Sequence, residues 1–177
     1  MKFIIVLATA LWLFAGLPIA TAGSPNDVCD LPKDLRAIVA AKYRGTAIVT
    51  AADLSGDGRA LFQKEHGDSC PGLVKVDFYG DGKPTFALEL TTTNQSNRRT
   101  TLVLLHRLAA NWKVATLDKA KGPVPVVWSE GPAEYKDMDD EKKIVANGPV
   151  IVFCGYSSWA VLYAWTSNKV VKIWLRD

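Results

Sequence analysis

Apolar positions near the start of the mature chain recur with the period of helices. Over residues 35–43 they repeat at spacings of three and four, and Gly45 gives a stop signal. A second helix is expected over about residues 57–65, with Ser55 as its N-cap and Gly67 closing it. The sequence therefore predicts two helices in the first part of the chain.

After these helices the period changes to two. Residues 74–78 and 86–90 alternate in polarity on either side of an Asp-Gly turn, which is a strong signal for a β-hairpin. Further strands are expected at residues 101–108, 112–118, 126–128, 150–154, 159–165 and 170–175. Residues 119–147, apart from the strand at 126–128, read as a loop rich in proline and charge.

Helices followed by a run of strands predict one α+β domain over residues 23–177. In this prediction the two N-terminal helices pack on one face of an antiparallel, meander-like β-sheet. Strands that follow one another closely along the chain favour antiparallel neighbours, because parallel strands need long crossovers.

The first 22 residues predict a secretory signal peptide. Lys2 precedes a short apolar run over residues 3–17, and Ala20-Thr21-Ala22 forms a small-x-small signature for cleavage after Ala22. Cleavage of 22 residues from 177 leaves 155, and no membrane span is expected after it. The prediction is an exported protein, periplasmic or extracellular. The net charge of +3 lacks the concentrated basic character of nucleic-acid binders.

Three cysteines follow the predicted signal peptide: Cys29, Cys70 and Cys154. Export makes a disulfide reasonable, and an odd number leaves one thiol over. Cys154 ends an apolar strand, where a thiol packs as a small hydrophobic group. Cys29 and Cys70 both lie beside turn residues, so they are the favoured pair.

Two segments share the pattern D-x-x-G-D-G, at residues 53–58 and 77–82. The second continues with Lys-Pro and resembles the turns of FG-GAP and VCBS-type repeats, whose acidic residues bind calcium. Carried over by position, this resemblance implies that Asp77 and Asp81 are calcium ligands.

The same loop departs from the family pattern at two positions. Tyr79 stands where Asn or Asp is expected, and Thr85 replaces the closing acid. Calcium takes about six to eight oxygen ligands, so two carboxylates fall short of a complete site. The preferred interpretation is a turn without a metal, in which Gly82 supplies a positive φ and Asp81 bonds to backbone amides.

Candidate catalytic groups are few. Cys70 and His66 lie close in sequence and are the candidates for a Cys-His hydrolase, but no third, orienting group is apparent. His66 is equally well explained by its position at a helix C-terminus, which favours a cation. His106 shares a strand face with leucines and is expected to be partly buried.

Aromatic residues gather on the last two strands. Trp159, Tyr163 and Trp165 share one face of a strand, and Trp174 lies on the next strand. Such a strip, if exposed, stacks on sugar rings or anchors a protein partner. The preferred alternative is that this face belongs to the core.

These observations favour a non-enzymatic secreted or periplasmic binding module, with a protein or glycan of the cell envelope as partner. Over its length the chain resembles small exported bacterial proteins. The alternatives are a calcium-binding module that uses Asp77 and Asp81, and a Cys-His hydrolase. Calcium is the one cofactor that the sequence suggests.

Overall fold

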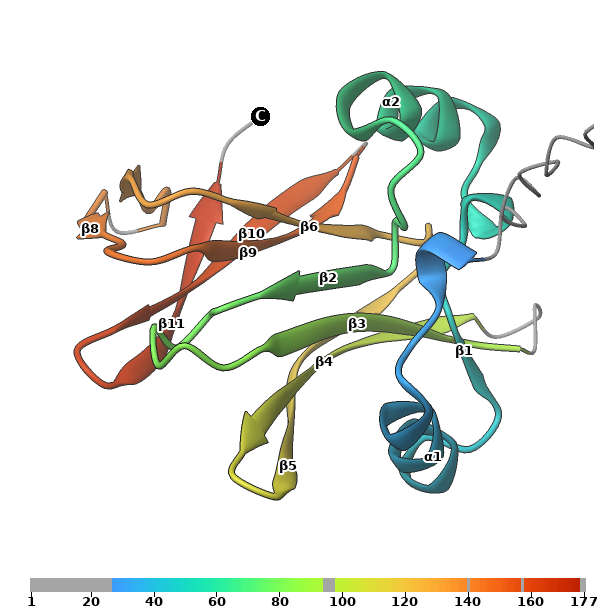
Figure 1. Ribbon diagram of the computed structural model, residues 1–177. Coiled ribbons are helices and arrows are strands. Elements are labelled where there is room, and N and C mark those ends of the chain that lie inside the picture. The colour runs from blue at the N-terminus through green and yellow to red at the C-terminus, as the bar shows by residue number, and fades with distance from the viewer. Residues whose placement is uncertain (1–26, 94–97, 140, 157, 176–177) are drawn as a thin grey trace, which may run out of the picture.

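Two larger antiparallel sheets, a two-stranded ribbon and two short α-helices make up most of the part of the chain that the computed structural model describes, namely residues 27–93, 98–139, 141–156 and 158–175. The predicted signal peptide lies outside these residues. Each sheet carries one helix on its outer face, as Figure 1 shows. No helix in the described ranges is long and apolar enough to cross a membrane.

The first helix, α1 (Lys33–Lys42), follows a short 3₁₀ turn at Asp27–Cys29. Leu35 and Val39 are one helical turn apart, and both are buried against the outer face of the first sheet. The predicted helical spacing is therefore confirmed, with an end at Lys42 instead of Tyr43.

The second helix, α2 (Gly56–His66), also confirms its prediction. The hydroxyl of Ser55 accepts a hydrogen bond from the backbone N–H of Gly58 at 3.1 Å, which makes Ser55 the N-cap. Gly67 ends the helix with a φ of +63°, a conformation that glycine adopts without strain. Phe62 is the buried anchor of this helix.

Sheet A runs in the order β1-β3-β4-β5, and β2 pairs with β3 beside β1. β3 pairs with β1 through its second half and with β2 through its first half. The strands are β1 (Thr46–Ile48), β2 (Leu73–Val76), β3 (Thr85–Thr92), β4 (Arg99–Leu108) and β5 (Asn111–Lys121).

Sheet B runs in the order β11-β10-β9-β6, and a separate two-stranded ribbon pairs β7 with β8. The strands are β6 (Val126–Glu130), β7 (Glu134–Lys136), β8 (Lys143–Val145), β9 (Val150–Gly155), β10 (Trp159–Thr166) and β11 (Lys169–Leu175). A second 3₁₀ turn, η2, spans Ala51–Asp53. β6 confirms the strand predicted at residues 126–128, whereas the ribbon of β7 and β8 lies where the sequence predicted a loop.

The two sheets pack face to face, and three clusters of buried side chains fill the layers. One cluster lies between α1 and sheet A, one between the sheets, and one between sheet B and α2. β3 and β9 are buried on both faces as a result. Strands covered on both sides read as continuous apolar runs, which is the pattern of β9.

The predicted fold class was therefore wrong. A single meander-like sheet with both helices on one face is replaced by a mostly β, two-sheet sandwich whose helices lie on opposite outer faces. The longer strands were correctly located, whereas the short strands β1, β7 and β8 were not predicted, and alternation shows only that a strand has two faces. It does not show whether water, a helix or a second sheet covers a given face.

The sheets are joined along one edge, where the chain runs from α2 into β2. There the backbone N–H of Val127 in β6 donates to the carbonyl of Pro71 at 2.8 Å. The next residue, Gly72, accepts a hydrogen bond from the N–H of Glu89 at 2.9 Å. A Cβ on Gly72 would lie 2.7 Å from the backbone nitrogen of Val49, so this position has no room for a side chain.

Gly72→Ala is expected to lower the free energy of unfolding by about 3 kcal/mol. The added methyl group would overlap backbone atoms and force apart the edge along which the two sheets are joined, which we call the seam. Denaturant unfolding of the variant and the wild type measures this loss. Gly131→Ala is the matched control, since a Cβ there meets nothing within 4 Å. If the free energy of unfolding falls as little for Gly72→Ala as for the control, the backbone around residue 72 can move to accommodate a side chain, which would contradict the prediction.

Candidate functional site

The bend between β2 and β3, residues 77–84, is shaped by its own carboxylates. Both oxygens of Asp77 accept backbone N–H groups, from Asp81 at 3.1 Å and from Gly82 at 2.9 Å. Asp81 accepts the N–H of Lys83 at 3.1 Å, and Gly82 has a φ of +76°. The Asp81 bond and the positive φ of Gly82 are those that the turn interpretation predicts, and the two bonds to Asp77 add to them. Asp77 and Asp81 thus have backbone partners, while calcium binding by them remains a prediction.

His106 of β4 ties this bend to sheet A. Its Nδ1 lies 2.9 Å from the hydroxyl of Thr85, and its Nε2 lies 3.3 Å from a carboxylate oxygen of Asp81. The ring of Tyr79 packs on the imidazole at 4.3 Å between centroids. The predicted burial of His106 is confirmed, with 5% of its surface exposed.

Thr85, His106 and Asp81 stand in the order hydroxyl, imidazole, carboxylate, which resembles the order of a hydrolase triad. Thr85, however, is 0% exposed, so a substrate has no access to its hydroxyl. Desolvation opposes ionisation of Asp81, but hydrogen bonds from Lys83 and the charges of His106 and Lys83 lower its pKa overall. The arrangement therefore holds the bend in place.

Three connections meet at one end of the sandwich, at the left of Figure 1. They are residues 77–84, residues 146–149 between β8 and β9, and residues 167–168 between β10 and β11. We call this region the three-loop end. Loops held together by a rigid sandwich are a common place for binding sites.

A cavity of about 280 Å³ opens at the three-loop end. Its aromatic walls are Tyr79 and Trp165, whose rings lie 4.8 Å apart at 71°. The polar side chains that line it are Asn147, Thr166, Ser167 and Asn168. In the described part of the chain these four side chains are not used in hydrogen bonds, so their amides and hydroxyls are available to a ligand.

The turn between β10 and β11 carries two of these polar residues, Ser167 and Asn168, on a well-defined backbone. Ser167 and Asn168 have φ values of +50° and +60°, the combination that a two-residue type I′ hairpin needs. The register continues to Thr166 opposite Lys169, so the turn is tightly closed. Ser167 and Asn168 therefore form a tight two-residue turn.

The predicted aromatic strip faces sheet A. The three aromatic residues of β10, Trp159, Tyr163 and Trp165, join the cluster between the sheets, as the core alternative predicted. Trp174 of β11 packs against the same cluster. Tyr163 is 2% exposed, whereas the three tryptophans are half-buried near the rim. Of the four, Trp165 is the one that lines the cavity at the three-loop end. The binding role of the other three remains a prediction.

Asp118 of β5 links the two sheets along the edge of the sandwich that lies opposite the seam at β6. It accepts hydrogen bonds from the hydroxyl of Tyr163 and, at 2.7 Å, from the ammonium of Lys172. Burial, together with the hydrogen bond to Asp118 and its charge, raises the pKa of Tyr163 above its ordinary value. Tyr163 thus remains a neutral donor that links the two sheets.

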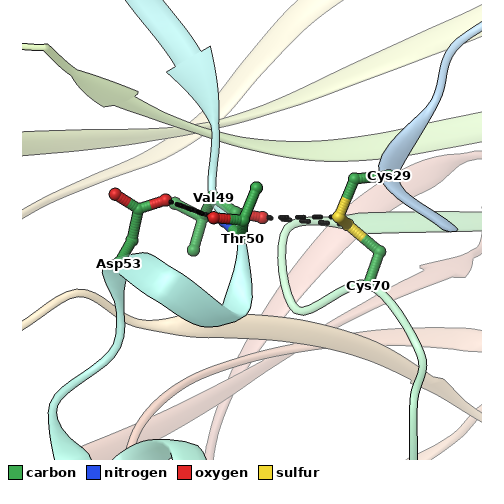
Figure 2. The surroundings of a disulfide bond; sticks show 5 residues. All are labelled: Cys29, Val49, Thr50, Asp53 and Cys70. Carbon is green, nitrogen blue, oxygen red and sulfur yellow. Dashed lines mark hydrogen bonds between the residues drawn. A yellow bond between two sulfur atoms is a disulfide. The ribbon is translucent and has the colours of Figure 1, made fainter. Parts of the chain in front are cut away.

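The predicted disulfide between Cys29 and Cys70 is confirmed. Figure 2 shows it beside the carbonyl of Val49, close to the turn in which the Asp53 carboxylate bonds to Thr50. Cys70 therefore has no thiol to act as a nucleophile. His66 lies in the last turn of α2, as predicted. Its ring packs between Phe62 and Trp128 at 4.9 and 4.8 Å.

One buried acid was not anticipated. Glu89 of β3 is 0% exposed, and neither of its carboxylate oxygens has a hydrogen-bond partner within the described residues. The hydroxyls of Thr91 and Thr100, on the same inner face, are likewise buried without partners there. Burial raises the pKa of Glu89 well above its ordinary value, and the charge of Asp53 raises it further.

The burial of Glu89 was not predictable from the sequence, because an acid in an alternating strand normally marks a solvated face. Sheet B covers that face instead. Within the described ranges, groups of three or more acidic, histidine or cysteine side chains suited to a metal ion are absent.

Comparison of the chain with protein-family models, curated proteins and solved structures finds no match. The geometry of the three-loop end is therefore the main guide to function. That end combines a cavity, aromatic walls and available polar groups, features typical of small-molecule sites.

Proposed function

We propose that the protein is a non-enzymatic, exported binding module that takes a small polar ligand at the three-loop end. The observation that carries this proposal is the cavity walled by Tyr79 and Trp165 and edged by amides and hydroxyls. Ligand sites in proteins are concave, with apolar walls and a few polar groups that fix orientation.

The site is held in a fixed shape, which favours binding over a chance surface hollow. Phe78 is buried under Tyr79, with ring centroids 5.1 Å apart, and His106 supports the other side of the Tyr79 ring. A wall that is already ordered loses little entropy when a ligand binds.

Two features argue for binding without catalysis. The hydroxyl of the triad-like set belongs to Thr85, which is inaccessible, and the candidate nucleophile Cys70 is oxidised. Export is proposed from the predicted signal peptide, and the Cys29–Cys70 disulfide is consistent with it, because disulfides persist in oxidising compartments.

The proposal is tested by two-dimensional NMR of the ¹⁵N-labelled mature protein against a library of small polar compounds. The library holds neutral sugars, amino acids, nucleosides and dicarboxylates. Ligand-induced shifts are expected to cluster on residues 79–80, 147–148 and 165–168. Trp165→Ala is expected to weaken binding at least about tenfold, the loss typical of a stacked aromatic anchor.

Trp112→Ala is the matched control. Trp112 lies on β5 and bonds to Asp34 of α1 at 2.8 Å, on the other side of sheet A from the inter-sheet layer. Its replacement should leave the ligand shifts unchanged. Shifts that cluster away from the three-loop end, or an absence of shifts with every compound class, would refute the proposed site.

A further inference from the structure

Building on the proposed function, which places the ligand at the three-loop end, we infer that the ligand is a neutral oligosaccharide. One sugar ring of it stacks on Trp165, and the rest of the chain extends into solvent. The inference follows from the chemistry of the cavity walls, from the local charges and from the size of the cavity.

The walls match the two kinds of surface that a sugar ring presents. The C–H bonds on one face of a pyranose carry slight positive charge and pack on the negative face of an indole or phenol ring. Trp165 supplies such a ring, and the Tyr79 ring packs against it at 4.8 Å as the neighbouring wall. The hydroxyls at the ring edge both donate and accept, as do the amides of Asn147 and Asn168.

The local charges favour a ligand without net charge. Among the described residues, those that line the cavity have uncharged side chains. In the bend beside the cavity, both carboxylate oxygens of Asp77 accept backbone N–H groups. The Asp81 carboxylate is paired, at 3.4 Å from the Lys83 ammonium and 3.3 Å from His106 Nε2. These pairs cancel most of the field that would attract an anion or a cation.

The size of the cavity fits one ring. A volume of about 280 Å³ is just below the range of about 300–1,000 Å³ that drug-sized ligands occupy. Because the cavity is open to solvent and edged by turns, a longer chain passes out of it without a steric barrier. For a contact through one ring of ordinary ligand efficiency, the expected dissociation constant is about 1 mM.

The test is an NMR titration of the mature protein with three neutral probes: cellotetraose, maltotetraose and tetra-N-acetylchitotetraose. At least one probe is expected to shift residues 79–80, 147–148 and 165–168, with an affinity that is unchanged between 50 and 500 mM salt. Tetragalacturonate, a charged oligosaccharide of the same length, is expected to bind more weakly.

Two variants separate stacking from hydrogen bonding. Trp165→Ala removes the stacking ring, and at least about a tenfold weakening is expected. Asn168→Gly removes the side-chain amide and keeps the positive φ, and about a fivefold weakening is expected. Asn111→Ala, at an exposed asparagine of the β4–β5 turn, should have no effect.

The outcomes distinguish this inference from the proposed function. If other library compounds shift the three-loop end while all three neutral probes do not, the sugar assignment is overturned and the proposed site stands. A charged probe that binds more tightly, with strong salt dependence, also overturns it. If no compound shifts that end, both are refuted.

Discussion

Replacement of both Cys29 and Cys70 by serine is expected to lower the free energy of unfolding by about 4 kcal/mol. The bond closes a sequence separation of 41 residues, and the chain-entropy relation for a loop of that length gives this value. For a domain of this size the melting temperature should fall by about 8–16 °C, which differential scanning calorimetry measures.

The position of the bond supports a large effect. Cys29 precedes α1 and Cys70 follows α2, so the bond ties together segments whose helices cover different sheets. Reducing agent should lower the melting temperature of the wild type to that of the double variant, and should leave the variant unchanged. A double variant with the same melting temperature as the oxidised wild type would contradict the prediction.

Glu89→Gln is expected to remove a pH dependence of stability that the wild type shows above about pH 4.5. The carboxyl of Glu89 is buried without partners, so the folded state favours its neutral form. In the unfolded chain the group has its ordinary pKa of about 4.3. The folded state therefore binds one more proton than the unfolded state over the interval between the two pKa values.

The sign of the effect follows from that proton. Below the unfolded pKa both states are protonated, and stability does not depend on this group. As the pH rises from there toward the folded pKa, the wild type loses about 1.4 kcal/mol per pH unit, because unfolding releases the proton. Glutamine has the same shape and no charge, so the variant lacks this slope.

Urea unfolding of the wild type and Glu89→Gln from pH 4 to pH 8 measures the difference. Glu141→Gln is the matched control, because the Glu141 side chain is 80% exposed, and its profile should follow that of the wild type. Parallel profiles for the wild type and Glu89→Gln would show that the folded protein accommodates an ionised Glu89.

Local chemistry made several features of the fold predictable. Ser55 caps α2 and Gly67 ends it because these bonds form within one helical turn. The bend at residues 77–84 is likewise closed by bonds between neighbours, from Asp77 to the amides of Asp81 and Gly82. The Cys29–Cys70 pair was favoured because Cys154 lies in an apolar strand, where a thiol packs as a small hydrophobic group.

The candidate site was predictable only in part. Trp165 was among the aromatic residues expected to bind, and Tyr79 was noted as the residue that breaks the calcium pattern. Nothing local connects them, since their contact depends on how β10 of sheet B passes the bend of sheet A. Asn147 carried no signal at all, because an exposed asparagine in a connection is unremarkable by itself.

The sequence by itself determined the two helices, the longer strands, the bend at residues 77–84 and the cysteine pair, because hydrophobic period, caps and turn residues act over a few positions. Tertiary structure decided which faces of the strands meet, and with that the two-sheet fold, the burial of Glu89 and the cavity beside Trp165. Each of these depends on contacts between residues far apart in the chain. The alternation of a single strand is the same whether water or another sheet covers it.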